Sequence, residues 1–138
     1  MQVIEHVETP RGSLRVVRHR VGLLASVAAG YLEVEVAHAL IRIGDAEIAR
    51  STGAFVHFLD WRGVTGYASA GRRLCTEWAM KQRPPYPELH IVTRHRLVNM
   101  GVAAAGMALA VAGRGLQGYS SHETYKAALE RLVGGRES

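Results

Sequence analysis

The sequence has a single cysteine and contains none of the histidine motifs that bind metal ions. One cysteine cannot form an internal disulfide, which excludes a disulfide-stapled scaffold and indicates a reducing compartment. The seven histidines occur in no H-x-H or H-E-x-x-H motif, and none forms a zinc-binding set with the cysteine. The sequence therefore predicts neither a metal site nor a bound cofactor.

Long apolar runs are also missing. The longest, residues 98–113, is shorter than the about 20 residues that a membrane-spanning helix needs, and its glycines and alanines indicate a buried helix. Met1 is followed by a charged, alternating segment rather than by the apolar core of a signal peptide. We therefore expect no transmembrane segment and a cytoplasmic location.

Lysine is scarce too, because all but two of the 17 basic residues are arginine. With 12 acidic residues the formal net charge is +5, which favours an anionic partner. The basic residues are spread along the chain, however, and no DNA- or RNA-binding motif is present, so a nucleic-acid partner is not predicted. The 138 residues, 48% of them apolar, predict one folded domain over 1–138 with a disordered tail from about 134 to 138.

The most informative stretch is residues 54–71, around which the rest of the chain is organised. Its apolar run over 54–59 predicts a strand covered on both faces, and hence a parallel sheet with helices packed against it. A polar break at 60–63 and a turn at 64–67 are expected to follow. The next helix is expected to begin near Ser69.

The remaining elements are predicted from periodicity and from turn residues. They are an antiparallel hairpin within 1–20, a strand at 23–29, a helix at about 36–50 ended by Gly53, a helix ended by the prolines after Arg83, a strand at 89–93, a helix at 96–113, a short strand, and a helix capped at Ser120. The small residues of the helix at 96–113 predict that it packs closely on the sheet. The fold class is thus α/β, a mixed sheet of about five or six strands with an N-terminal antiparallel hairpin and about four helices.

Three segments of this pattern resemble the STAS domain, which is shared by sulfate transporters and bacterial anti-sigma-factor antagonists. Residues 30–40 resemble that family's entry to its first helix, residues 54–71 its central strand, turn and helix start, and residues 119–129 its closing strand and helix. The pattern is also similar to small bacterial proteins described as STAS- or Sec14-like. The resemblance implies a STAS-like fold and a regulatory role in binding another protein.

The sequence departs from that family at the start of the helix. In family members that are switched by phosphorylation, this turn carries an acidic residue and a phosphoacceptor serine, and the matching positions here are Ala68 and Ala70. Ser69 lies one place before the acceptor position, at a helix N-terminus, where a phosphate would be favoured. One hypothesis is that Ser69 or Thr65 accepts a phosphate. The other, which we favour, is that Ser69 only caps the helix.

Loops at the carboxyl ends of parallel strands are where ligands and partners usually bind, and two sets of residues are predicted there. The partner-binding set comprises Asp60, Trp61, Arg62, Tyr67, Arg72 and Arg73. A rim for anions comprises Arg62, Arg94, His95 and Arg96. The alternatives are that Asp60 pairs with one of these arginines on a solvated face, and that Trp61 and Tyr67 cover the core.

No catalytic set is visible, so an enzyme is not predicted. His57 and Cys75 lie in apolar segments and are expected in the core. We therefore predict a domain that binds a partner protein through residues 60–73. The first alternative is a carrier that holds an anionic or lipid-like molecule between the sheet and the helix at 98–113. The second is a structural homo-oligomer, because the N-terminal hairpin leaves an open sheet edge.

Overall fold

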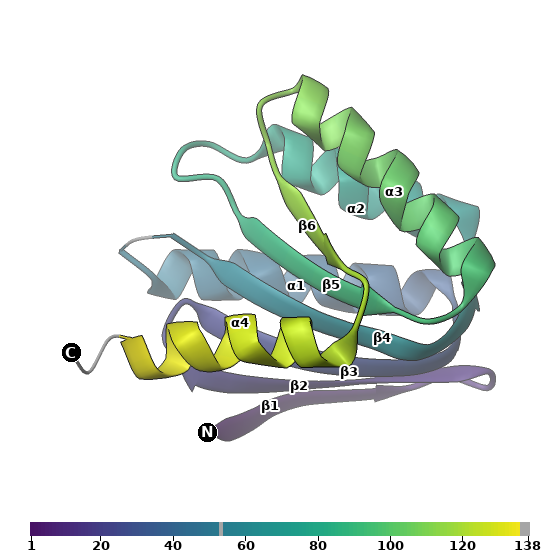
Figure 1. The fold of residues 1–138 in the computed structure, drawn as a ribbon, viewed down its shortest axis with the longest axis horizontal. Coiled ribbons are helices and arrows are strands. Elements are labelled where there is room, and N and C mark those ends of the chain that lie inside the picture. Colours follow the sequence, from purple (N-terminus) through teal and green to yellow (C-terminus); the bar gives the residue numbers. More distant parts are fainter. Residues whose placement is uncertain (53, 136–138) are drawn as a thin grey trace.

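The computed structural model describes residues 1–52 and 54–135, in which strands and helices follow one another in a regular order (Figure 1). The strands are β1 (Gln2–Glu8), β2 (Gly12–Arg20), β3 (Leu23–Leu32), β4 (Val56–Tyr67), β5 (Glu88–Thr93) and β6 (Leu116–Tyr119). The helices are α1 (Val34–Arg50), α2 (Ser69–Lys81), α3 (Arg96–Val111) and α4 (His122–Gly135). The expected α/β fold, with an N-terminal hairpin and four helices, is confirmed.

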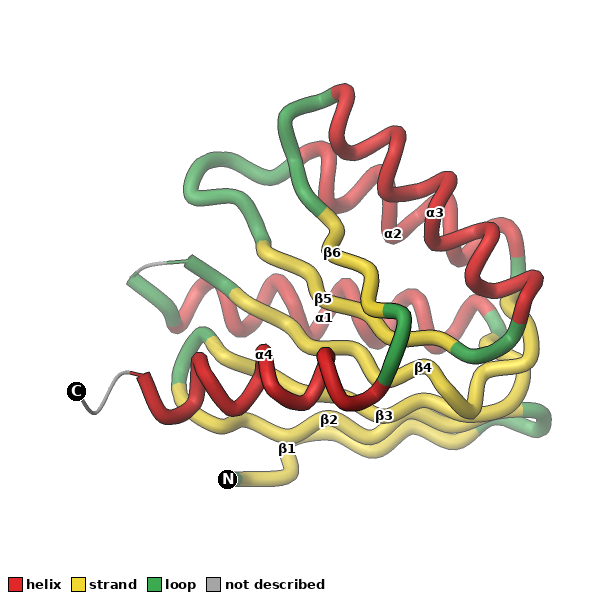
Figure 2. Tube along the Cα trace, in the orientation of Figure 1, coloured by secondary structure: helices red, strands yellow, loops and turns green. Residues whose placement is uncertain are grey.

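The six strands form one sheet in which each strand lies beside the next one in the chain, in the order β1-β2-β3-β4-β5-β6 (Figure 2). β1, β2 and β3 pair antiparallel, whereas β3 to β6 pair parallel and are joined by helices. The helices α1, α2 and α3 lie on one face of the sheet, and α4 lies on the other (Figure 1). The carboxyl ends of the parallel strands and the amino ends of the helices therefore meet at one edge.

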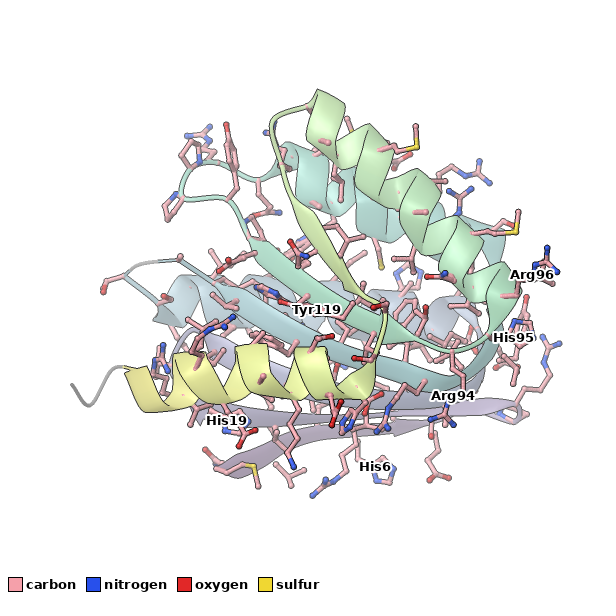
Figure 3. The ribbon with its side chains drawn as sticks, in the orientation of Figure 1. His6, His19, Arg94, His95, Arg96 and Tyr119 are labelled. Atoms are coloured by element: carbon pink, nitrogen blue, oxygen red, sulfur yellow. The ribbon has the colours of Figure 1, made fainter. Side chains whose placement is uncertain are left out.

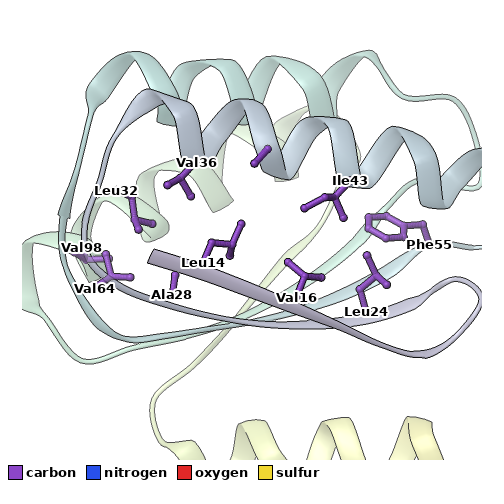
Figure 4. Packing of buried hydrophobic residues seen from close by; sticks show 11 residues of the cluster. Leu14, Val16, Leu24, Ala28, Leu32, Val36, Ile43, Phe55, Val64 and Val98 are labelled. Carbon is purple, nitrogen blue, oxygen red and sulfur yellow. The ribbon is translucent and has the colours of Figure 1, made fainter. Parts of the chain in front are cut away.

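The core on the α1 side is built from β2, β3 and the inner face of α1 (Figure 4). Leu14 and Val16 are fully buried, whereas Arg15 between them is exposed, as the alternation of apolar and polar residues predicts. A second cluster lies under α4, where the rings of Phe58 and Tyr125 meet edge to face at 70° with their centroids 5.6 Å apart. The sheet is thus covered on both faces at β4, as the apolar run of that strand predicted.

β4 extends well beyond the strand that the sequence predicted. Residues 60–67, expected as a polar break and a turn, continue the strand to Tyr67. β3 likewise continues to Leu32, and the two strands stay paired in parallel over this stretch through two register shifts. The prediction of a turn was wrong because Gly63 and Gly66, which usually mark turns, here lie in irregular strand pairing.

The ends of α4 also differ from the predicted ones. Ser121, not Ser120, precedes the helix, and its Oγ accepts a hydrogen bond of 3.3 Å from the backbone N–H of Thr124. The helix continues to Gly135, so the predicted tail does not begin at residue 134. Residues 136–138 lie outside the described part of the chain, as does Gly53, which was predicted to end the first helix.

α2 makes its main contacts with α1 and α3 rather than with the sheet. It approaches α1 closely at Gly44, where a Cβ atom would lie 2.7 Å from the Trp78 ring. The Trp78 Nε1–H donates a hydrogen bond of 2.8 Å to Asp45 Oδ1 across the same contact. Only Gly71 and Ala79 of α2 are buried, so this helix is held against its neighbouring helices and stands off the sheet.

A buried ion pair between Arg18 and Glu47 connects α1 to β2 and to the turn that follows it. The Glu47 carboxylate is 1% exposed and accepts hydrogen bonds from Arg18 Nη2 at 2.7 Å, Arg18 Nε at 3.0 Å and the Gly22 backbone N–H at 2.9 Å. Burial alone would raise the pKa of Glu47, but the hydrogen bonds from Arg18 and Gly22 and the Arg18 charge outweigh it and hold the pKa below its ordinary value. The pair therefore stabilises the fold at neutral pH, and this contribution is lost as the pH falls through the lowered pKa.

Replacing Glu47 with alanine is expected to lower the free energy of unfolding by about 3 kcal/mol, because Arg18 and the Gly22 N–H would lose their partner in a buried place. Glu5→Ala is the matched control, since Glu5 pairs with the exposed Arg42 at 2.6 Å and should contribute less than about 1 kcal/mol. Urea denaturation of both variants measures the difference. Equal losses in the two variants would contradict the structural role of Glu47.

Candidate functional site

The alternation of side chains along β4 divides the predicted partner-binding residues between the two faces of the sheet. Trp61 and Tyr67 lie on the side of α1, α2 and α3, where they pack against the core. Arg62 lies on the α4 side and lines a hollow there together with His122. Asp60 is on the same side, bonded to Arg62. The predicted set therefore does not form one surface.

Asp60 is paired with Arg62, as one of the sequence alternatives expected. Arg62 Nε donates to Asp60 Oδ1 at 2.9 Å and Nη2 donates to Oδ2 at 2.8 Å, while the Arg62 backbone N–H donates to Oδ1 at 3.2 Å. Burial by itself would raise the pKa of Asp60, but the hydrogen bonds and charge of Arg62 outweigh it and lower the pKa below its ordinary value. Arg62 is thus neutralised within the fold and has less charge to offer to an external anion.

A polar hollow lies at the carboxyl ends of β5 and β6, beside Arg62 of β4 and the first turn of α4. Three residues of the predicted anion rim line it, namely Arg62, Arg94 and Arg96. His95 is not among the lining residues; it lies between β5 and α3 (Figure 3), and its buried Nδ1 has no hydrogen-bond partner within the described residues. The other polar residues of the hollow were not predicted from the sequence; they are Thr93, Asn99, Tyr119, Ser120, Ser121 and His122. They could have been found only with the strand order, which places β6 beside β5.

A separate cavity of ≈ 140 Å³ lies between the sheet and the three helices on its other face. Trp61 and Tyr67 reach it from β4, and Gly101 and Ala105 reach it from α3. A Cβ atom on Gly101 would collide with the Tyr67 hydroxyl group, so glycine is required where α3 crosses this residue. The cavity lies where the sequence placed the ligand of a carrier, although α1 and α2 line it as well.

Three side chains in this cavity carry polar groups of different reactivity. His57 Nε2 lies 3.0 Å from Ser26 Oγ, and burial lowers the pKa of His57 to about 4. Burial also raises the pKa of Cys75 to about 11, so its thiol stays protonated at neutral pH and is a poor nucleophile. The Nε1–H of Trp61 is buried and has no hydrogen-bond partner within residues 1–52 and 54–135. Of the three, the indole N–H is the group whose bonding capacity is unused.

The start of α2 has no side-chain cap. Ala68 occupies the N-cap position, and Ser69 is the first residue of the helix, exposed and without a capping hydrogen bond. The hypothesis that Ser69 caps the helix is therefore wrong, because the helix begins at Ser69 itself, one residue earlier than a capping Ser69 would require. Arg72 and Arg73 are exposed in the same turn of helix, and Thr65 is exposed on β4.

α3 exposes large apolar side chains on the face turned away from the sheet. Leu97, Met100 and Met107 are 68%, 62% and 73% exposed. Ala104 and Ala108 are exposed on the same stripe, which contradicts the expectation that the small residues of this helix serve only to pack on the sheet. A helix that is apolar all round has the pattern of a buried one, so the sequence did not reveal this exposed face.

Within the described residues, no group of three or more histidine, cysteine, aspartate or glutamate side chains is placed to hold a metal ion. The helices in that part of the chain are all too short or too polar to cross a bilayer.

Comparison with solved structures shows what this architecture is similar to. One similar structure is an anti-sigma factor antagonist from Mycobacterium paratuberculosis, with a TM-score of 0.60 and 17% sequence identity over 90% of this chain and 99% of that one. Another is an uncharacterised protein of the DUF3478 family with a SpoIIAA-like fold from Shewanella loihica PV-4, with a TM-score of 0.59 and 14% identity over 94% and 98% of the two chains. No protein-family model and no curated protein matches the sequence. The STAS-like fold expected from the sequence is confirmed.

The burial of His57 predicts a loss of stability on mild acidification. Its pKa falls from the ordinary 6.5 to about 4 on folding, so between these values the unfolded chain binds a proton that the folded chain excludes. The contribution of His57 to the free energy of unfolding is therefore complete above pH 6.5. It falls by about 3 kcal/mol as the pH approaches about 4. Urea titrations across this window should show a steeper slope in the wild type and in the exposed-residue control His38→Gln than in His57→Gln, which keeps the contributions of His19 and His90, whose pKa values burial also lowers. A His57 imidazole that titrates near its ordinary pKa by NMR would contradict the prediction.

Proposed function

We propose that this chain is a non-enzymatic regulatory domain that binds a partner protein at the sheet edge where α2 and α3 begin. The observation that carries the proposal is the exposed apolar face of α3, which is built around Leu97, Met100 and Met107. A contiguous apolar surface on a water-exposed helix usually marks an interaction site, and methionine adapts well to a partner's shape. No charged residue lies between Arg96 and Arg114 to interrupt this face.

Arginines surround the amino-terminal end of the α3 face. Arg94 and Arg96 lie just before and at the start of α3, and Arg72 and Arg73 lie in the first turn of α2, which packs against α3. All four side chains are exposed, and none forms an ion pair within the described residues. The chemistry that fits this surface is a partner protein with an apolar centre and an acidic margin.

The polar hollow is the proposed place for an acidic group of the same partner. Arg94 and Arg96 belong both to the hollow and to the margin of the α3 face, whereas Arg62 is neutralised by Asp60. Guanidinium groups bind carboxylates through two parallel hydrogen bonds, which would fix the partner's orientation. The effective rim is then Arg94 and Arg96, with His95 outside it.

The similarity to known structures supports the class of function and not the identity of the partner. The structure from Mycobacterium paratuberculosis is described as an anti-sigma factor antagonist, and a protein of that description acts on another protein. The proposal keeps Arg72 and Arg73 from the partner-binding set predicted from the sequence. It leaves out Trp61 and Tyr67, which line the cavity, and Asp60, which is already paired.

The double variant Leu97→Glu/Met100→Glu is expected to lose the partner, because two carboxylates in the apolar centre would have to be desolvated on binding. Val3→Glu/Val21→Glu is the matched control, since these two valines are exposed to a similar degree, Val3 on β1 and Val21 in the turn between β2 and β3. Tagged wild type and variants would be isolated from the host after mild cross-linking and compared by quantitative mass spectrometry. We expect one protein to be retained by wild type and control and to fall at least about tenfold in the α3 variant.

Two results would contradict this proposal. One is that the α3 variant retains the same proteins as the wild type while circular dichroism shows that both are folded. The other is that light scattering finds a wild-type homo-oligomer that the α3 variant converts to a monomer, because the apolar face would then be covered by a second copy of the chain.

Phosphorylation at Ser69, or at Thr65, stays a secondary prediction. Ser69 is exposed at an uncapped helix start beside Arg72 and Arg73, where a phosphate would meet free backbone N–H groups and positive charge. The intact mass of protein isolated from its host should then show a phosphate-sized increment that Ser69→Ala removes, or Thr65→Ala if that residue is the acceptor. A mass without any increment would remove this prediction and leave the partner-binding proposal untouched.

A further inference from the structure

The apolar cavity between the sheet and helices α1, α2 and α3 shares only Arg72 with the proposed partner surface. Its volume of ≈ 140 Å³ is close to the about 150 Å³ that suffices for a benzene-sized molecule in other proteins. The lining is almost wholly apolar, for example Leu59, Ile91, Val102 and Leu109. The cavity exists because α2 packs on its neighbouring helices instead of on the sheet.

One buried N–H group of the cavity lining has no acceptor among the described residues. Trp61 lines the cavity, and its buried Nε1–H has no partner in the part of the chain that the structure describes. The other tryptophan of the lining, Trp78, donates its Nε1–H to Asp45 and is satisfied. Buried donors in native proteins are nearly always paired, so an unpaired one beside an open apolar space indicates a missing acceptor.

A ligand supplies that acceptor better than a water molecule does. A buried water needs two to four polar partners, and the side chains around Trp61 in this lining are mostly apolar. Of the charged residues of the lining, Glu33 is paired with Arg11 at 2.9 Å, whereas Arg72 has no ion pair within the described residues. Because, among the described residues, the positive charge of Arg72 is unpaired and the negative charge of Glu33 is paired, the cavity disfavours a cationic ligand. The ligand that supplies the acceptor is therefore neutral or anionic.

We infer that this cavity binds a compact apolar molecule, about the size of one six-membered ring with a short substituent, whose oxygen atom accepts a hydrogen bond from Trp61 Nε1. The apolar body replaces empty space with van der Waals contacts, and the oxygen satisfies the indole N–H. The site is distinct from the α3 outer face, so that a ligand in the cavity leaves Leu97, Met100 and Met107 open to a partner protein.

The first test compares acetophenone with ethylbenzene, because the two molecules have nearly the same shape and differ by one carbonyl group in place of a methylene. Wild-type protein is expected to bind acetophenone about five- to tenfold more tightly, which is the usual value of one neutral hydrogen bond. In a ¹⁵N-labelled protein the two indole N–H signals report the contact directly. The Trp61 signal should shift to saturation with acetophenone, while the Trp78 signal, held by Asp45, should move little.

Trp61→Phe keeps an aromatic ring in place and removes the donor together with part of the indole volume. Ethylbenzene, which cannot accept a hydrogen bond, is therefore measured in the same variant as the reference for the change in size. We expect the substitution to lower the affinity for acetophenone to that for ethylbenzene in the same variant. Its loss of one indole signal also assigns the Trp61 resonance. A preference for acetophenone that survives in Trp61→Phe would overturn the role of this residue.

Two leucine substitutions on neighbouring residues of α3 test the place of binding. Ala105 lines the cavity, whereas Ala104 is exposed on the outside of the same helix. Ala105→Leu should fill the cavity and abolish binding of both molecules, and Ala104→Leu should bind both like the wild type. The wild-type titration alone keeps the proposal testable if Ala105→Leu does not fold.

The absence of a saturable shift of the Trp61 signal with either molecule would overturn the inference, and so would binding that Ala105→Leu leaves unchanged. The variant Leu97→Glu/Met100→Glu separates this site from the partner surface, since it should bind acetophenone like the wild type. Loss of acetophenone binding in that variant, with its fold intact, would show that the site is not the internal cavity.

Discussion

From residue 58 to residue 62, successive side chains of β4 point to opposite faces of the sheet, and this alternation decides what Asp60, Trp61 and Arg62 can do. Asp60 and Arg62 fall on the α4 side, where they satisfy each other beside the polar hollow. Trp61, between them in sequence, falls on the other side and reaches the apolar cavity. A short stretch of chain thus contributes to two separate sites. Neighbours in the sequence are kept apart by a sheet that is buried on both faces.

The cavity follows from a second constraint, which is the close contact between α1 and α2. Gly44 leaves room for the Trp78 ring, and the hydrogen bond from Trp78 to Asp45 fixes the approach of the two helices. α2 is then supported mainly by its neighbours and buries little of its own surface. α3, held against Tyr67 at Gly101, closes the space above the sheet and turns its outer apolar face to solvent. α3 therefore lines the cavity with one side and exposes its apolar face on the other.

The order of the elements could be predicted because its signals are local. The apolar run at 54–59, the alternation around Leu14 and Val16, and the prolines after Arg83 each depend on a few neighbouring residues. The pairing of Asp60 with Arg62 was foreseeable for the same reason, as the two are close in sequence. The continuation of β4 to Tyr67 was not, because glycine marks a turn in most contexts and only the pairing with β3 shows otherwise. The cavity and the members of the polar hollow depend on how several distant elements pack, and no local pattern encodes that.

The chain resembles phosphorylation-switched STAS domains in its fold but lacks the residues that carry their phosphorylation chemistry. An alanine side chain at position 70 has no oxygen to phosphorylate, and Ala68 has no carboxylate to assist. Proteins that share a fold of this kind can have different functions, so function has to be inferred from the residues of the site. In this chain the features that need an explanation are an apolar face without a cover, exposed arginines without carboxylates, and a buried indole N–H without an acceptor. Each lacks a complement within the described residues, and each specifies the chemistry of what would bind there.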